Sequence, residues 1–263
     1  MKKKLIPIFQ ATLSIAILLL IWTIASNTGI FGRVSVKASK FLLPPPTKVF
    51  QSMYEMTMSG YLIKNIWISM QRVITGFVIA VVIGLPVGIG MGMSKTINNF
   101  LNPILKLFSP IPGVAWVPLA ILWFGLGSNA AIFIITVGSI SPIIINTLQG
   151  VRDVDKKLLQ ALKTMDASKL QVIRWCIVPS IIPYIVSGFK LGLGFAWRVV
   201  IAAELVGVPD GLGFVLNVGR NTGDTAVTIV TIICLGVIMI IMEQLFFAPI
   251  EKITRFWRVQ VYE

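Results

Sequence analysis

The sequence contains no histidine and only two cysteines, Cys176 and Cys234, which both lie in apolar surroundings. Without histidine or clustered cysteine, zinc, haem and iron–sulfur sites lose their usual protein ligands. Catalytic centres that pair histidine with serine or cysteine are excluded as well. The two cysteines fall in separate apolar stretches, which argues against a structural disulfide. We therefore expect a protein without a cofactor.

Charged residues are also scarce, at 13% of the chain against roughly 25% in soluble domains. Hydrophobic residues make up 56%, a composition typical of an integral membrane protein. The rarest charge is the negative one, with 10 Asp/Glu against 23 Lys/Arg and a net charge of +13. In a membrane protein, basic loops that face anionic lipid explain this excess. The expected partner of these charges is therefore the lipid bilayer and not nucleic acid.

Six apolar runs are long enough to cross a bilayer as helices. The first, Leu5–Ala25, follows three lysines and exceeds the roughly 7–15 apolar residues of a signal peptide, so we predict an uncleaved span. The other five predicted spans are, in order, Ile66–Met93, Leu101–Phe124, Ala130–Leu148, Tyr184–Val206 and Ala226–Phe247.

The distribution of basic residues orients these spans. Thirteen Lys/Arg fall in segments predicted on the cytoplasmic side and six in segments predicted outside, which places both termini in the cytoplasm. The main outer segment is Asn27–Asn65, where Thr47 is predicted to cap a short helix that ends near Gly60. The later outer segment, Gly207–Thr225, has the composition of an ordinary turn.

Glycine and proline indicate how the spans pack. One face of the second span carries a small residue at every fourth position, which lets a neighbouring helix approach closely; these residues are Gly76, Ala80, Gly84, Gly88 and Gly92. The third span is interrupted by prolines, so it must be buried among other helices or line an aqueous cavity; these are Pro103, Pro110, Pro112 and Pro118.

The end of the second span, GLPVGIGMGMSKT, superficially resembles a phosphate-binding loop. That motif requires glycine directly before Lys-Ser/Thr and a preceding strand. Here Ser94 precedes Lys95-Thr96, and the lead-in is a membrane helix. We therefore expect any ATP hydrolysis in a partner subunit, and this chain is not predicted to be an enzyme.

The stretch 149–183 is the longest charged interruption between apolar spans. Its apolar residues Leu158, Leu159, Leu162 and Met165 recur at helical spacing, which predicts a short amphipathic helix. Asp155 is the predicted N-cap, and Asp166 lies where this helix would end. Such a helix between two spans offers a surface to a cytoplasmic partner. The alternative is a merely solvated charged loop.

This stretch resembles the EAA loop of ABC-importer permeases, whose pattern is Glu-Ala-Ala, three residues, Gly, nine residues and Ile-x-Leu-Pro. Gln160-Ala161-Leu162, Asp166 and Cys176-Ile177-Val178-Pro179 occupy these places. The departures are Gln160, Leu162, Asp166 and Cys176. The resemblance extends over roughly residues 65–258 and is greatest to the nitrate/sulfonate/taurine branch. The matching blocks are Ser69–Phe77, Pro110–Gly127, Pro142–Asp155, Leu191–Gly207 and Gly211–Leu216.

The resemblance implies an all-α integral membrane protein with six transmembrane helices. Five would form a MetI-like permease core over 65–258, which includes the loop 149–183. Residues 1–64 would supply a peripheral N-terminal helix and an extracytoplasmic segment, and 259–263 a cytoplasmic tail. The implied location is the bacterial plasma membrane.

The implied function is ATP-driven import of a small, anionic solute such as a sulfonate, taurine or nitrate; bicarbonate and vitamin precursors also stay open as solutes. The implied partners are cytoplasmic ABC ATPase subunits, an extracytoplasmic solute-binding protein and a second copy of the chain. The helix around 156–167 would dock in a groove of the ATPase. The residues expected to carry this coupling are Lys156, Leu158, Leu159, Gln160, Ala161, Leu162, Thr164, Met165, Asp166, Ala167 and Pro179.

A charged residue inside a membrane span costs free energy, so its presence there points to a functional role. Lys190, Arg198 and Glu204 all lie in the fifth span, within about a third of its circumference at 100° per residue. We predict that Arg198 lines the translocation path, with Glu204, Lys190 and Trp197 as further candidates. The alternative is that Arg198 only joins helices through a salt bridge.

A different function class is an ion-gradient-driven secondary transporter or channel. It would need acidic residues within the membrane for coupling, and only Glu204 and Glu243 qualify. It would also show inverted repeats, which this sequence lacks. The importer hypothesis is therefore favoured.

Overall fold

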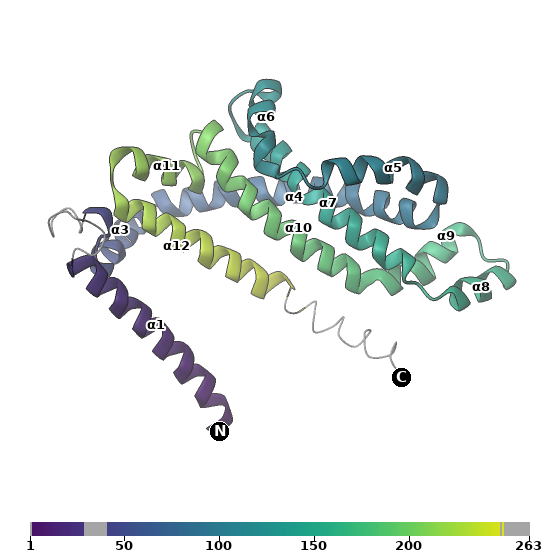
Figure 1. Ribbon diagram of the computed structural model, residues 1–263, viewed down its shortest axis with the longest axis horizontal. Coiled ribbons are helices and arrows are strands. Elements are labelled where there is room, and N and C mark those ends of the chain that lie inside the picture. Colours follow the sequence, from purple (N-terminus) through teal and green to yellow (C-terminus); the bar gives the residue numbers. More distant parts are fainter. Residues whose placement is uncertain (1, 29–40, 248, 250–263) are drawn as a thin grey trace.

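The computed structural model describes residues 2–28, 41–247 and 249, and every regular element in these ranges is a helix (Figure 1). This confirms the all-α fold class. The predicted tail 259–263 and part of the outer segment Asn27–Asn65 lie outside the described residues. The elements are α1 (Lys2–Thr28), α3 (Pro46–Met58), α4 (Tyr61–Met93), α5 (Lys95–Phe108), the 3-10 turn η1 (Gly113–Trp116), α6 (Val117–Phe124), α7 (Ser128–Arg152), α8 (Lys156–Thr164), α9 (Lys169–Val172), the π-helical η2 (Ile173–Ile177), α10 (Val178–Gly207), α11 (Leu212–Thr222), α12 (Thr225–Met242) and the π-helical η3 (Glu243–Phe247).

Four stretches of the described chain are long and apolar enough to cross a membrane: α4, α7, Lys169–Gly207 and Thr225–Leu245. A fifth is the pair formed by α5 and the η1–α6 segment, which is bent by 88°. These five correspond to the second to sixth predicted spans. The first predicted span lies in α1, whose apolar stretch is Thr12–Thr28.

The three central helices are α4, α7 and α10 (Figure 1), and the predicted small-residue stripe brings the first two together. A Cβ atom added at Gly76 would lie 2.7 Å from Cγ2 of Ile135, and one at Gly88 would lie 2.7 Å from Cβ of Thr147. Only glycine permits this approach, because real Cβ contacts are not so short. The stripe predicted from the sequence is therefore a true packing surface.

The direction of these contacts shows that α4 and α7 run parallel. Gly76 meets Ile135, Gly84 meets Ile143 and Gly92 meets Val151, so residue numbers rise together along both helices. The chain must return to the starting side between two parallel helices. The bent pair α5–α6 makes this return and is therefore a crossing.

The bend corrects the prediction of one interrupted helix over Leu101–Phe124. α5 ends at Phe108, and the chain turns by 88° before η1 and α6 continue. Pro110 and Pro112 lie in this turn, and neither can donate the backbone hydrogen bond that would continue a helix. The sequence indicates where the span is interrupted, whereas the size of the turn depends on the helices around it.

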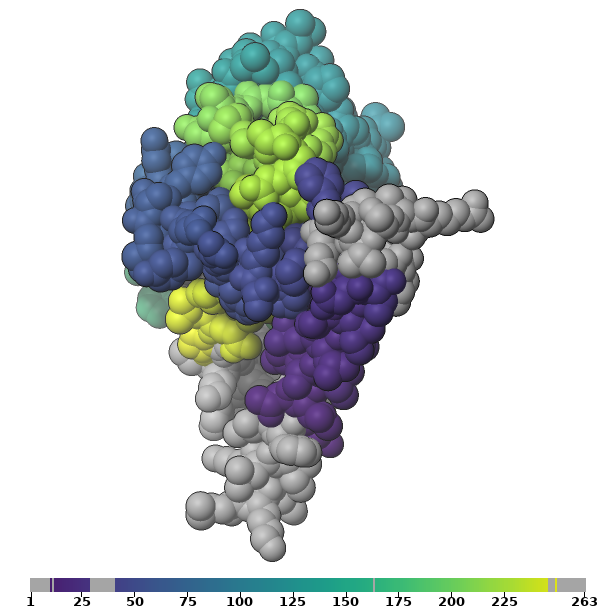
Figure 2. All heavy atoms as spheres, turned by 90° about the vertical axis from the view of Figure 1, so that its left-hand side faces the viewer, coloured from purple at the N-terminus to yellow at the C-terminus, as the bar shows by residue number. Residues whose placement is uncertain are grey.

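The end of the bundle opposite α8 is built from α3, α11 and the start of α4, as Figure 2 shows in blue and yellow-green. Here α1 (purple) is joined to the loop before α3: the Trp22 indole donates to the Pro44 carbonyl at 3.1 Å, and the Ser26 hydroxyl donates to the Leu43 carbonyl at 2.8 Å. Apolar side chains such as Leu18, 64% exposed, cover the rest of α1. Such a surface suits contact with lipid.

Two predictions for this end were wrong in detail. The short outer helix begins at Pro46, with Pro45 at the N-cap, and Thr47 makes no capping bond. Proline is well suited to the first helical turn because its fixed φ matches the helix. The segment Gly207–Thr225 is not an ordinary turn, since it contains α11.

Candidate functional site

The amphipathic helix predicted in the central loop is α8, and local capping sets both of its ends. The Asp155 carboxylate accepts the backbone N–H of Lys157 at 2.8 Å, which satisfies a free donor of the first turn. At the other end Asp166 takes a left-handed conformation with φ of 55°, and the N–H of Ala167 donates to the Leu162 carbonyl at 3.1 Å. Both predicted end residues are thus confirmed.

The apolar residues of α8 divide between two sides. Leu159 and Leu162 pack against a buried cluster that includes Val154 and Ile181. Leu158 is 51% exposed and Met165 76% exposed. The predicted coupling set therefore separates into inward anchors and an outward surface. The members with exposed side chains are Lys156, Leu158, Gln160, Ala161, Thr164, Met165 and Asp166, while Ala167 and Pro179 are half-buried.

The loop that carries α8 is held by contacts with both flanking membrane helices, α7 and α10. The Tyr184 hydroxyl of α10 donates to Asp153 at 2.6 Å, and a Cβ atom on Gly150 of α7 would lie 2.8 Å from the Tyr184 ring. Pro179 lies in the first turn of α10, and Ser168 forms a capping box with Gln171 before α9. These contacts join the end of α7 to the start of α10, on the two sides of the loop that carries α8.

Further exposed side chains extend the outward surface of α8. Leu170 of α9 is 73% exposed and Trp175 of η2 is 71% exposed, with the Arg174 guanidinium 5.5 Å from the Trp175 ring. A Trp–Arg pair is a frequent anchor in protein interfaces. The surface of α8, α9 and η2 is therefore mixed apolar and cationic.

The four predicted pathway residues of α10 share no common surface. Arg198 is exposed and makes no hydrogen bond or ion pair within the described residues, whereas Trp197 is buried and its indole donates to the Leu235 carbonyl of α12 at 3.0 Å. Lys190 pairs with Glu243 of η3 at 2.7 Å. Of these residues, only Arg198 keeps a free charged group on the outer face of α10.

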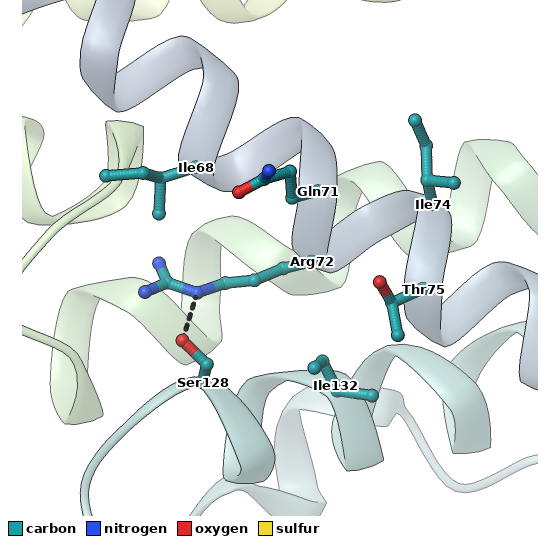
Figure 3. Close-up of a pocket in the computed structure, with 7 residues that line it drawn as sticks. All are labelled: Ile68, Gln71, Arg72, Ile74, Thr75, Ser128 and Ile132. Atoms are coloured by element: carbon teal, nitrogen blue, oxygen red, sulfur yellow. Dashed lines mark hydrogen bonds between the residues drawn. The ribbon is translucent and has the colours of Figure 1, made fainter.

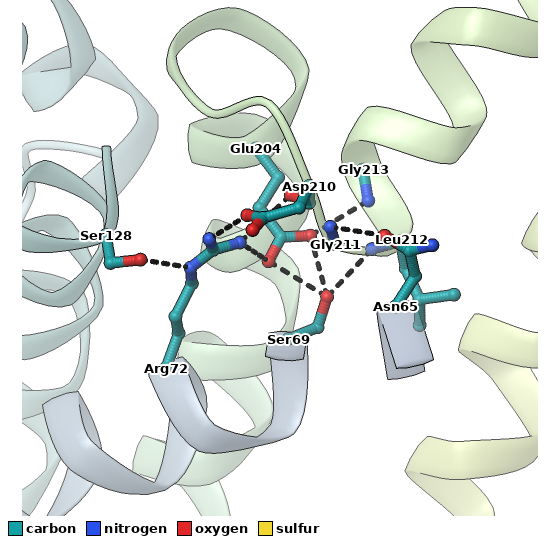
Figure 4. A network of polar contacts seen from close by, with 9 residues as sticks. All are labelled: Asn65, Ser69, Arg72, Ser128, Glu204, Asp210, Gly211, Leu212 and Gly213. Atoms are coloured by element: carbon teal, nitrogen blue, oxygen red, sulfur yellow. Dashed lines mark hydrogen bonds and ion pairs between the residues drawn. The ribbon is translucent and has the colours of Figure 1, made fainter. Parts of the chain in front are cut away.

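Glu204 lies in the core and pairs with a cation that the sequence analysis did not select. Its carboxylate accepts from Nη1 of Arg72 at 2.8 Å, from the Ser69 hydroxyl at 2.8 and 2.9 Å, and from the backbone N–H of Gly213 at 2.9 Å (Figure 4). Glu204 is 1% and Arg72 4% exposed. Glu204, a predicted pathway candidate, is therefore buried and ion-paired with Arg72 of α4.

The same network ties the loop after α10 to α4 and α7. Arg72 donates from Nη1 to the Asp210 carbonyl at 3.0 Å, pairs through Nη2 with the Asp210 carboxylate, and donates from Nε to the Ser128 hydroxyl at 3.1 Å. The loop N–H groups of Gly211 and Leu212 donate to Asn65 and Ser69, each at 2.8 Å. Arg72, Glu204 and their partners therefore join α4, α7, α10 and the loop that leads into α11 (Figure 4).

The loop also requires glycine at one position. Gly211 has φ of 98°, and a Cβ atom there would lie 2.4 Å from the Glu204 carboxyl group. Both the backbone conformation and the contact exclude a larger residue. The blocks Ser69–Phe77, Leu191–Gly207 and Gly211–Leu216 meet at this point. The sequence contained one signal for the Arg72–Glu204 pair. The second and fifth predicted spans run in opposite directions, which places Arg72 and Glu204 near the same end of the bundle.

A groove of about 410 Å³ opens beside Arg72 between α4 and α7, where Gln71, Thr75 and Ser128 supply polar groups (Figure 3). The Arg72 guanidinium borders it but already donates to Ser128, Glu204 and Asp210. Its charge is balanced, so this groove is not an obvious anion site.

Known proteins with similar sequences or structures indicate the family to which this chain belongs. Residues 80–248 match the family described as "Binding-protein-dependent transport system inner membrane component". The taurine transport system permease protein TauC of Escherichia coli is 33% identical over 89% of this chain and 86% of its own length. The putative aliphatic sulfonates transport permease protein SsuC of Bacillus subtilis is 31% identical over 85% and 78%.

The nitrate import permease protein NrtB of Synechocystis is 28% identical over 94% of this chain and 89% of its own length. Among solved structures, a chain of the inward-facing MetNI methionine ABC transporter superposes with a TM-score of 0.62 at 22% identity, over 74% of this chain and 94% of that one. This likeness supports the fold, and the sequence matches support the nitrate/sulfonate/taurine branch. The chain belongs to the family of inner membrane components of binding-protein-dependent transport systems, the permeases of ABC importers.

Proposed function

We propose that this chain is the membrane subunit of an importer for a small anionic solute and that α8 docks in a cytoplasmic ABC ATPase. The observation that carries the proposal is the division of α8 into inward anchors, Leu159 and Leu162, and an outward surface with Leu158 and Met165. Large exposed apolar groups on a capped, rigid helix suit a protein interface. ATP-driven movement of the ATPase would reach α7 and α10 through the Tyr184–Asp153 bond.

The anionic solute is inferred from chemistry. Nitrate is an anion, and taurine and aliphatic sulfonates carry a sulfonate group; these are the solutes in the names of three related permeases. Arg198 is exposed on α10 and has no hydrogen-bond or ion-pair partner in the described part of the chain. An unpaired cation in a span belongs at a water-filled path or a partner surface.

The complete transporter is proposed to contain two copies of this chain, ATPase subunits and an extracytoplasmic binding protein. One chain leaves the Arg198 face uncovered, and a second copy would close a path between two such faces. An ion-gradient mechanism finds less support, because both candidate acids in the described spans are ion-paired, Glu204 with Arg72 and Glu243 with Lys190.

The test is co-purification of the tagged full-length chain from its native host in mild detergent. Recovery of a P-loop ATPase and a solute-binding protein is expected. Met165→Asp should remove the ATPase, because it places a charge in the proposed interface. Met58→Asp is the matched control, since Met58 is 67% exposed at the opposite end of the bundle. An ATPase that stays bound to Met165→Asp would contradict the docking role of α8.

A further inference from the structure

Two cavities on one side of α7 adjoin each other and form a single groove. The first, about 380 Å³, lies between α5 and the end of α7 and includes Lys106 and Arg152. The second, also about 380 Å³, lies between the bend after α5, α7 and α10, and includes Phe195 and Val199. Both are lined by Ser109, Pro110 and Ile145. The groove therefore runs from the α8 end of the bundle toward its middle.

The end of the groove near α8 is cationic. Lys106 and Arg152 line it together with the amides of Asn102 and Gln149, and no acidic residue does. Within the described residues neither cation pairs with a carboxylate; Arg152 donates from Nη2 to the Asn98 side-chain oxygen at 2.8 Å, which leaves its other N–H groups available. Gln149 also donates to the Asp153 carboxylate at 3.1 Å, so one acid lies beside the site, without an ion pair to either cation in the described part of the chain. The two cations and the neutral amides that line the cavity itself favour an anion.

The inner part of the groove has a firm, mainly apolar wall. A Cβ atom on Gly113 would lie 2.8 Å from Cγ2 of Val199, and one on Gly138 would lie 3.2 Å from the same atom. These close contacts hold the bend after α5, α7 and α10 together. Ser109 and Ser141 supply hydroxyl groups to this wall, which Phe108 and Phe195 also line. The wall can thus guide a small solute without holding it tightly.

Arg198 lines neither cavity, but it lies on α10 between Phe195 and Val199, which both line the inner one. Leu191, Phe195 and Arg198 are exposed on α10 at spacings of four and three residues, which places them on one stripe. Phe195 lines the groove, and Arg198 follows one turn later. Among the described residues, Arg198 is thus a third cation without a carboxylate partner, on the same helix as Phe195 and Val199 of the groove.

We propose that this groove is one wall of the solute path and that Lys106 and Arg152 form an anion-binding site at its α8 end. The site would take an oxyanion such as a sulfonate or nitrate and release it toward the ATPase side. This rests on the proposed function for the anionic nature of the solute. The only cation among the described residues that line the groove beside Arg72 is Arg72 itself, which is ion-paired, so this groove is not included in the proposed path.

The electrostatic character of the groove can be measured without knowing the solute. In the full-length chain with Cys176→Ala and Cys234→Ala, Ser109→Cys places a thiol where the two cavities meet. Its rates of modification by the anionic sulfonatoethyl and the cationic trimethylammonioethyl methanethiosulfonates are compared in phosphatidylcholine nanodiscs. The ratio of the two rates cancels differences in thiol reactivity.

The control is Thr75→Cys, in the groove beside Arg72. We expect the anionic-to-cationic rate ratio at Ser109→Cys to exceed that of the control by about tenfold, because a cationic cleft concentrates anions. Lys106→Gln combined with Arg152→Gln should abolish this excess. A ratio that does not respond to these two substitutions overturns the proposal.

A second arm distinguishes a transported anion from a lipid headgroup. Nanodiscs that contain phosphatidylglycerol should give the same labelling rates at Ser109→Cys as phosphatidylcholine alone. If phosphatidylglycerol protects the thiol, the site holds lipid and the path proposal is wrong. Neither outcome depends on ATPase co-purification, so the proposed function and this site can fail separately.

Discussion

Glu204 and Glu243 are acidic residues of spanning segments, and each forms an ion pair with a basic residue. The two pairs differ in how far they are buried. Glu204 is fully buried and also accepts from Ser69 and Gly213. Glu243 meets Lys190 at a surface where the two side chains are 44% and 37% exposed. Breaking a buried ion pair leaves an uncompensated charge, whereas long side chains exposed near the end of a span can reach water or lipid headgroups once a partner is lost.

Glu204→Gln should therefore destabilise the protein far more than Glu243→Gln. We expect a loss of about 3–5 kcal/mol for the first, the usual range for a broken buried pair. The second should cost about 0–1 kcal/mol, as exposed pairs do. Equilibrium unfolding in mixed dodecyl sulfate micelles measures both. Equal losses would mean that the Arg72–Glu204 pair is not a stabilising centre.

Arg198 has the opposite character, since it has no partner within the described residues and lies on an exposed face. Arg198→Leu should leave stability and ATPase co-purification unchanged. It should abolish uptake of labelled taurine or nitrate, whichever of the two the native transporter accepts. Arg198→Lys keeps the charge and should retain part of the uptake. Uptake that survives Arg198→Leu would remove this residue from the path.

At the scale of single elements, local chemistry determines α8 and tertiary packing determines the broken span. Asp155, Leu162 and Asp166 lie within three turns of one another, so their roles could be predicted from the sequence alone. The 88° turn after α5 depends on Gly113 and Gly138 meeting Val199 of α10. Residues so far apart in sequence give no periodic signal. The Arg72–Glu204 pair was missed for the same reason, since 132 positions separate its members.

The end of α8 offers a direct test of this local control. Asp166 has φ of 55°, a conformation that suits glycine and is tolerated by aspartate. Asp166→Gly should leave α8 intact or slightly stabilise it. Asp166→Val should cost about 1–2 kcal/mol because a β-branched residue resists the left-handed region.

Hydrogen exchange of the α8 amides measures the effect, with faster exchange expected only for Asp166→Val. Thr164→Val is the control, since position 164 has helical geometry. If both valine variants exchange alike, the left-handed residue is not what ends the helix.

At the scale of the whole molecule, helix lengths and directions constrain how the chain lies in a bilayer. α4 has 33 residues, which corresponds to about 50 Å at 1.5 Å per residue. The hydrocarbon core of a bilayer is about 30 Å thick, so α4 must tilt or project beyond it. The parallel packing of α4 and α7 then requires the chain to cross back through α5, η1 and α6.

This topology predicts that the α3–α4 turn and α8 lie on opposite sides of the membrane. Three crossings separate exposed Ser59 from exposed Thr164: α4, the bent α5–α6 pair and α7. If the bent pair were a re-entrant loop, only two crossings would separate them and both would face the same side. The sides on which Ser59 and Thr164 lie therefore show whether the bent pair crosses the membrane. The counts of basic residues predict that Thr164 lies on the cytoplasmic side.

Single-cysteine variants Ser59→Cys and Thr164→Cys, made with Cys176→Ala and Cys234→Ala, test this with a membrane-impermeant maleimide. In right-side-out vesicles Ser59→Cys should be labelled and Thr164→Cys protected, and inside-out vesicles should reverse the pattern. Detergent permeabilisation, which should expose both, is the control for reactivity. Labelling of both from one side would mean that α5–α6 does not cross, which the parallel contacts of Gly76, Gly84 and Gly92 with α7 oppose. A reversed pattern would keep three crossings but invert the chain, and α8 could then not reach a cytoplasmic ATPase.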